Sequence, residues 1–195
     1  MFMCLQNKII TIVCEGPSEN AYIQEINRLF KEEEIPLTFI GRPSEGGHYK
    51  AVISKYKSEK DKNPRSDIRI WVDWDRYMRN DSKDMDHYKK KSSKIPNFLF
   101  SYMNFEDFLV LHLTRDKLNQ WISSCIRRNH FKSPSKSNEY LDEFKHFIGG
   151  YSKGEIPIEI SKASLENLKR NQEDLKVPIK CDFAKELFEL IDKVC

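Results

Sequence analysis

The chain has 195 residues, of which 33 are basic and 30 are acidic. This near balance of charge does not by itself indicate a nucleic-acid-binding protein. No apolar run approaches the roughly 20 residues that a membrane span needs, and polar residues interrupt the N-terminal apolar stretch too early for a signal peptide. We therefore expect a globular protein of the cytoplasm that does not act at a membrane.

Five cysteines are spread along the chain without any CxxC pair. This spacing indicates neither a disulfide framework nor a zinc site. Scattered thiols of this kind fit the reducing conditions of the cytoplasm.

Strand and helix patterns alternate through the first half of the chain. The organising stretch is KIITIVCEGPSE at 8–19, whose β-branched run predicts a strand buried on both faces. Gly16 and Pro17 end this strand, and Ser18 is placed to cap the helix that follows. Further patterns predict strands over 35–40, 67–72 and 97–103, and helices over 18–33, 46–56 and 104–113.

The second half of the chain is mainly helical in pattern. Helices are predicted over 118–128, 138–148, 163–173 and 182–194, with a glycine-marked break around 149–157. The alternation in the first half predicts an α/β fold with a four-stranded, mainly parallel, Rossmann-like sheet in the strand order 2-1-3-4. We expect a core domain over 1–115 and a helical elaboration over 116–195 that packs on it.

Acidic side chains follow two of the predicted strands. Asp73 and Asp75 follow the third strand and point to the same face, because alternate residues of a strand share a face. Glu15 follows the first strand and comes to the same edge if the first and third strands are neighbours. Three carboxylates, without histidine or cysteine in the set, select Mg²⁺ or Mn²⁺ over zinc. The sequence therefore predicts a metal site at this edge of the sheet.

These residues carry a resemblance to a known family. Glu15-Gly16 and Asp73-Trp74-Asp75 resemble the motifs of TOPRIM domains, which occur in topoisomerases, bacterial primases, maturation nucleases and overcoming-lysogenization-defect nucleases. A narrower likeness is to the RloB-like branch of these nucleases, which is related to the TOPRIM effector of the PARIS system. That likeness also includes Ser18-Glu19, Tyr22, Asn104-Phe105-Glu106, His112, Tyr151 and Lys153.

The resemblance implies metal-dependent cleavage of phosphodiester bonds. Asp73 and Asp75 would hold Mg²⁺ or Mn²⁺, and Glu15 would act as general acid or base or as a further metal ligand. Glu106, at the start of the helix after the fourth strand, would be another catalytic residue or ligand. Basic side chains would hold the nucleic-acid backbone without reading its sequence, namely Arg42, Lys50, Arg76, Lys89, Lys90 and Lys91.

The same resemblance implies a biological role. RloB-like proteins are associated with bacterial anti-phage defence, so we expect a toxic effector that cleaves RNA, transfer RNA included, or DNA and causes abortive infection. Such effectors work beside an ATPase that senses infection. This chain has no P-loop, so a partner protein would supply the ATPase. The sequence leaves the oligomeric state open.

Other interpretations of the same residues stay open at this point. Glu15 and Glu106 could each interact with a helix N-terminus, and Asp73 and Asp75 could be solvated turn residues. His112 falls on an apolar face, which indicates a core residue rather than a ligand. A different class of function is a non-catalytic TOPRIM scaffold that docks on an ATPase complex and regulates it, although three retained carboxylates argue against that class. A phosphoacceptor receiver domain would need its acidic pair after the first strand, and a primase-like enzyme would carry a zinc-binding module.

Overall fold

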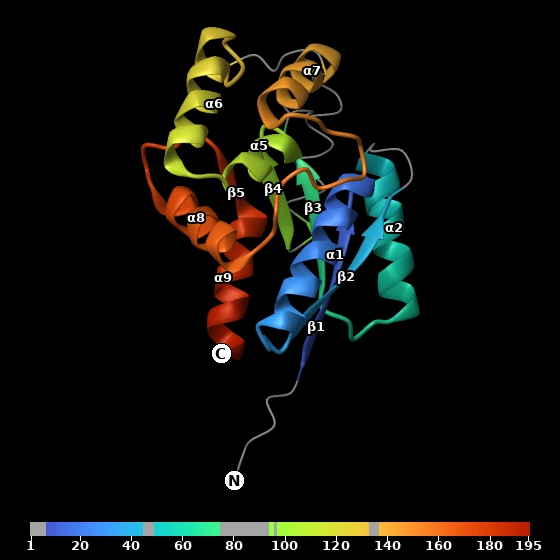
Figure 1. The fold of residues 1–195 in the computed structure, drawn as a ribbon. Helices are drawn as coiled ribbons and strands as arrows, with labels where there is room; N and C mark the ends of the chain where they lie inside the picture. The colour runs from blue at the N-terminus through green and yellow to red at the C-terminus, as the bar shows by residue number, and fades with distance from the viewer. Residues whose placement is uncertain (1–6, 45–48, 75–93, 96, 133–136) are drawn as a thin grey trace.

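The structure is a computed structural model, and it describes residues 7–44, 49–74, 94–95, 97–132 and 137–195. Its centre is a sheet with the strand order β2-β1-β3-β4-β5 (Figure 1). The strands are β1 (Lys8–Cys14), β2 (Leu37–Pro43), β3 (Ile68–Asp73), β4 (Phe98–Tyr102) and β5 (Lys180–Cys181). Strands β1 to β4 run parallel, and β5 runs antiparallel to β4. The predicted Rossmann-like α/β class and the order of its first four strands are confirmed, but the predicted count of four strands is wrong, because β5 adds a fifth strand beside β4.

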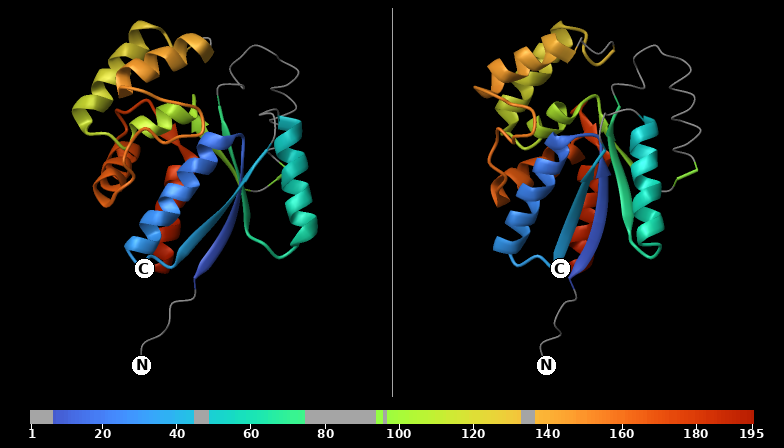
Figure 2. Two further views of the ribbon diagram at one scale, coloured as in Figure 1. Left: turned by 45° about the vertical axis from the view of Figure 1, so that its right-hand side comes forward. Right: turned by 90° about the vertical axis from the view of Figure 1, so that its right-hand side faces the viewer.

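Helices cover both faces of this sheet. They are α1 (Pro17–Glu32), α2 (Tyr49–Lys62), α5 (Phe105–Val110), α6 (Arg115–Arg127), α7 (Ser137–Ile148), α8 (Lys162–Glu173) and α9 (Asp182–Val194). Helices α1 and α9 lie on one face and α2 lies on the other (Figure 2). Helices α5, α6 and α7 lie beyond the carboxyl ends of β1 and β3, at the top of Figure 1. Within the described ranges, no helix has both the length and the apolar character that crossing a bilayer requires.

The burial of β1 explains its nearly continuous apolar run. Ile10 and Ile12 join the core on the side of α1 and α9, whereas Val13 joins a smaller cluster with Val52 and Ile53 of α2. Successive strand residues point to opposite faces, so a strand covered on both faces needs apolar residues at almost every position. This is the arrangement that the sequence predicted.

Aromatic rings join the last helix to the sheet. The ring of Phe183 in α9 stacks on that of Trp71 in β3, with centroids 4.1 Å apart and planes 9° apart. Tyr22 and Phe108 meet Trp71 edge to face at 5.9 and 5.2 Å. The predicted boundary at residue 115 stays a prediction, but these contacts place α9 in the same hydrophobic core as the strands.

Two elements run further than their local sequence predicted. Strand β2 continues through Arg42 and Pro43, which pair with Val13 and Cys14 of β1. Proline is tolerated there because β2 is an edge strand. Helix α2 continues to Lys62 rather than ending in the lysine-rich segment after residue 56. Its buried Glu59 lies 3.3 Å from Arg42 Nε and 3.2 Å from Lys62 Nζ, so a contact with β2 supports the last turns.

Candidate carboxylate site at the edge of the sheet

Two of the predicted acidic residues lie at the carboxyl ends of neighbouring strands. Cys14 of β1 pairs with Trp71 of β3, so Glu15 directly follows the paired segment and Asp73 is the last residue of β3. Both residues are half-buried. Neighbouring strands are about 4.8 Å apart, and ligands of open α/β sheets bind beyond this edge. Asp75, the third predicted ligand, lies outside the described residues.

Glu106 is a further carboxylate next to this edge. It lies in the first turn of α5, which follows β4, the other neighbour of β3. Burial raises the pKa of Glu106 to about 7, and the charges of Glu19 and Asp107 act in the same direction. Hydrogen bonds from its own backbone N–H and from the Tyr151 hydroxyl oppose that rise. A carboxyl group with a pKa near neutrality can both accept and release a proton at physiological pH.

Glu19 is a buried carboxylate that the predicted site did not include. It lies in the first turn of α1 and is 6% exposed. Burial raises the pKa of Glu19, while backbone N–H groups of Glu19 and Gly16 and the charge of Lys153 oppose the rise. A glutamate three residues after an N-cap commonly accepts from the N-cap N–H, so Glu19 closes the start of α1. Its proximity to Glu106 also concentrates negative charge here.

The segment after α7 reaches back to the same edge. Tyr151 is buried, and its hydroxyl oxygen lies 3.2 Å from Glu106 Oε1 and 3.1 Å from Ser18 Oγ. The backbone N–H of Gly154 donates to Ser18 Oγ at 3.0 Å. The prediction that Ser18 caps α1 is wrong, because Gly16 is the N-cap and the Ser18 hydroxyl contacts this distant segment instead. Lys153 lies between Tyr151 and Gly154 in this segment, and its charge acts on the carboxylate of Glu19.

The predicted backbone-binding residues are only partly described. Arg42 is half-buried and pairs with Glu59, and Lys50 is exposed in the first turn of α2. Arg76, Lys89, Lys90 and Lys91 lie outside the described residues, so their role stays a prediction. His112 is 2% exposed and packs against Tyr22 and Phe108, which confirms that it is a core residue.

The donor atoms at this edge are of the chemical type that hard divalent cations bind. They are carboxylate oxygens, which Mg²⁺ prefers. Cys14 is the nearest soft donor; its thiol donates to the Gly16 carbonyl oxygen at 3.7 Å, and its burial and the charges of Glu19 and Glu15 raise its pKa. Among the described residues, no three of these carboxylates place oxygens within 4.8 Å of one another. Glu15 and Asp73 are therefore the described part of the predicted metal site.

Burial is the property of this site that sequence patterns did not reveal. The acidic residues that end strands were found from their position, since a strand end is visible as the end of an apolar run. Glu19 and Tyr151 were visible only as members of the resemblance, because Tyr151 meets Ser18, the neighbour of Glu19, through a contact between residues 133 positions apart.

Comparisons of the chain with models of known protein families, with curated proteins and with solved structures find no match. The interpretation of this site therefore depends on its geometry and on the motifs of the chain itself.

Proposed function

We propose that the protein is a Mg²⁺- or Mn²⁺-dependent nuclease of TOPRIM type, with the carboxylate edge as its active site. The observation that carries this proposal is that Glu15, Asp73 and Glu106 lie at or after the carboxyl ends of three neighbouring parallel strands, β1, β3 and β4. Partly buried carboxylates at one edge of a sheet are electrostatically unfavourable unless a cation or a proton compensates them. Metal-dependent phosphodiester cleavage uses both kinds of compensation.

Each residue has a distinct part in this mechanism. Asp73 and Glu15, together with Asp75, would hold the metal ion, which when bound polarises the scissile phosphate and lowers the pKa of water. Glu106 holds or releases the proton that moves during cleavage, because burial brings its pKa to about 7. Tyr151 orients Glu106 through the hydroxyl contact of 3.2 Å. Lys153, close enough to act on Glu19, supplies positive charge for the phosphate.

The wider role follows the motifs described above. The protein would act in the cytoplasm as the RloB-like toxic effector of an anti-phage defence system, with RNA or DNA as substrate and an ATPase as partner. Its described cysteines support a reducing compartment, because Cys14, Cys125 and Cys181 are buried free thiols and Cys195 is an exposed one.

A cleavage assay tests the proposal. Purified protein is incubated with total cellular RNA or plasmid DNA in Mg²⁺, in Mn²⁺ or in EDTA, and Glu15→Gln is compared with Glu166→Gln, an exposed glutamate of α8. We expect cleavage that requires the metal, falls by about a hundredfold or more in Glu15→Gln, and is unchanged in Glu166→Gln. Cleavage in EDTA, or equal rates for the two variants, would contradict the proposal. A folded wild-type protein that neither cleaves nor binds Mn²⁺ would favour the docking-subunit alternative.

A further inference from the structure

A second group of metal-binding side chains lies away from the carboxylate edge. It consists of Asp107 in α5, Cys125 in α6 and His130 just after α6. Each offers one ligand atom, and the three atoms lie within 4.8 Å of one another. All three side chains are fully buried, at 0% exposure. Chain segments that meet only in the folded state therefore bring a carboxylate, a thiol and an imidazole together.

Hydrogen bonds orient the members of this group. Trp121 Nε1 donates to Asp107 Oδ1 at 2.7 Å, and the other oxygen, Oδ2, lies 3.0 Å from His130 Nε2. The imidazole of His130 stacks on the ring of Tyr140 in α7, with centroids 4.7 Å apart. One carboxylate oxygen is thus held by an indole, while the other faces the imidazole.

Without a cation, the polar atoms of this group are incompletely compensated. Nδ1 of His130 is buried and has no hydrogen-bond partner among the described residues, which costs free energy. The buried carboxylate of Asp107 has only a thiol and an imidazole beside it in the group. Burial and the charge of Asp107 both raise the pKa of the Cys125 thiol.

A divalent cation would compensate the buried charge of this group. An aspartate, a thiolate and a neutral imidazole carry two negative charges, which a divalent ion neutralises inside the buried group. Sulfur and imidazole donors select zinc over Mg²⁺. The indole N–H on Asp107 Oδ1 then has the orienting role that groups around metal ligands commonly have.

Arg128 is the charged residue next to the thiol. Its Nη2 lies 3.9 Å from Cys125 Sγ, while its Nη1 pairs with Glu143 of α7. An N–H directed at a sulfur favours the thiolate, and the charge of Arg128 lowers the pKa of Cys125 accordingly. The pairing with Glu143 limits its repulsion of a bound cation.

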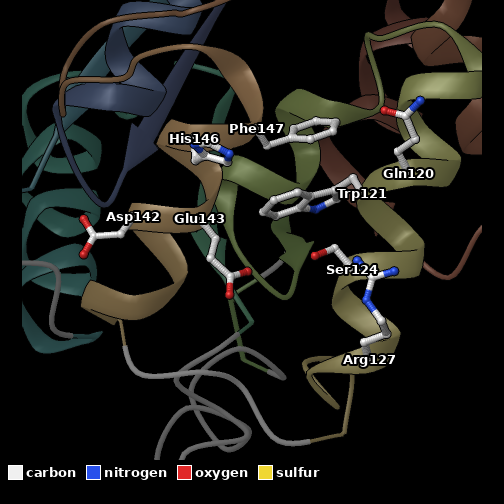
Figure 3. Close-up of a pocket in the computed structure, with 8 residues that line it drawn as sticks. All are labelled: Gln120, Trp121, Ser124, Arg127, Asp142, Glu143, His146 and Phe147. Atoms are coloured by element: carbon white, nitrogen blue, oxygen red, sulfur yellow. The ribbon is translucent and has the colours of Figure 1, made fainter.

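A cavity lies close to this group, separated from Asp107 by the side chain of Trp121. This cavity, of about 500 Å³, lies between α6 and α7, and Trp121, which donates to Asp107, forms part of its wall (Figure 3). The side chains around it include Gln120, Ser124 and His146 (Figure 3). Asp107, Cys125 and His130 do not line this cavity, so Trp121 is the side chain that links its wall to the group.

We propose that Asp107, Cys125 and His130 bind one zinc ion, with water in the remaining position of its coordination shell. The ion would join α5 and α6 to the turn that carries His130. Because Asp107 follows Glu106 directly, it would also hold the first turn of α5 in place. This proposal does not depend on the nuclease proposal, since it concerns a different donor set and a different metal.

Cobalt titration of the wild-type protein tests it directly. Protein stripped of metal by a chelator is titrated with Co²⁺, and absorption is recorded through the near ultraviolet and visible range. We expect a thiolate-to-cobalt charge-transfer band whose absorbance reaches its maximum at one equivalent of Co²⁺ and which Zn²⁺ abolishes. Cobalt held by carboxylate oxygens alone at the edge of the sheet would give no such band, because the band requires a thiolate ligand.

Matched cysteine variants assign the ligand. The band should be lost in Cys125→Ser and retained in Cys195→Ser, which removes an exposed thiol at the end of the chain. A folded wild-type protein that shows no charge-transfer band would overturn the proposal. A band that persists in Cys125→Ser would overturn it equally. Absence of the band in the wild-type protein overturns the proposal whether or not Cys125→Ser folds.

Discussion

At the scale of single residues, His112 shows how burial controls a titratable group. Its ring is 5.4 Å from that of Tyr22 and 5.4 Å from that of Phe108, in the core under α1. Burial lowers its pKa to about 3. In the unfolded chain an imidazole titrates near pH 6.5, so between these two values the unfolded state binds the extra proton.

This difference predicts a stability that falls as the pH falls. Between about pH 6.5 and about pH 3, the wild-type protein should lose roughly 1 kcal/mol of unfolding free energy per pH unit through His112. His112→Phe should flatten the dependence, and His146→Phe, at an exposed position of α7, should leave it unchanged. Urea denaturation at several pH values measures the slopes. Equal slopes for the wild type and His112→Phe would contradict the assignment.

The raised pKa of Glu106 predicts the opposite dependence of stability on pH. Its pKa in the folded protein, about 7, lies above the ordinary value of 4.5, so its charged form is disfavoured in the fold and stability decreases as the pH rises between these values. In EDTA at about pH 8, Glu106→Gln should therefore stabilise the protein by on the order of 1 kcal/mol. Thermal denaturation measures the change, with the exposed Glu155→Gln as control. A lower melting temperature for Glu106→Gln would contradict the claim that burial disfavours the charged form of Glu106.

At the scale of elements, α9 illustrates what periodicity predicts well. The predicted helix over 182–194 has the observed bounds, Asp182–Val194, because Phe183, Leu187 and Leu190 recur at helical spacing. The extended ends of β2 and α2 were missed, since they depend on Glu59 pairing with a strand residue rather than on local pattern. Strand β5 has two residues and forms against β4, so it has no periodic signal of its own.

The packing of α9 gives a prediction at the same scale. Phe183 is 1% exposed and stacks on Trp71, so Phe183→Ala leaves a cavity at the centre of the core. We expect a loss of about 3–5 kcal/mol in unfolding free energy. Phe188→Ala, at a half-buried position of the same helix, should cost less. Chemical denaturation compares them, and equal losses would show that the stack is not central.

At the scale of the whole molecule, the C-terminal half takes part in both the core and the site. Tyr151 and Gly154 contact Ser18, and Phe183 covers Trp71. A fragment of residues 1–115 would lack these contacts and expose the face of the sheet under α9. We expect it not to unfold cooperatively on heating, as followed by circular dichroism. A cooperative transition in this fragment would show that the predicted core domain folds alone.

The positions of acidic side chains were predictable where a strand ends. Glu15 and Asp73 were identified because carboxyl ends of neighbouring parallel strands meet at one edge, and the order of β1 and β3 confirms that they are neighbours. Cysteine spacing indicated no zinc site, because Cys125 meets Asp107 and His130 only through the packing of α5 against α6. Local spacing cannot show donors that tertiary contacts assemble.

The most direct test of the nuclease proposal is the single-turnover cleavage rate of Asp73→Asn in Mg²⁺. The substitution keeps the shape of the side chain and removes the charge proposed to hold the metal. The control is Asp192→Asn, at an exposed position of α9. We predict that Asp73→Asn lowers the rate by about a hundredfold or more, with no effect of Asp192→Asn. A rate for Asp73→Asn equal to that of the wild type would contradict a metal-dependent site at this edge of the sheet.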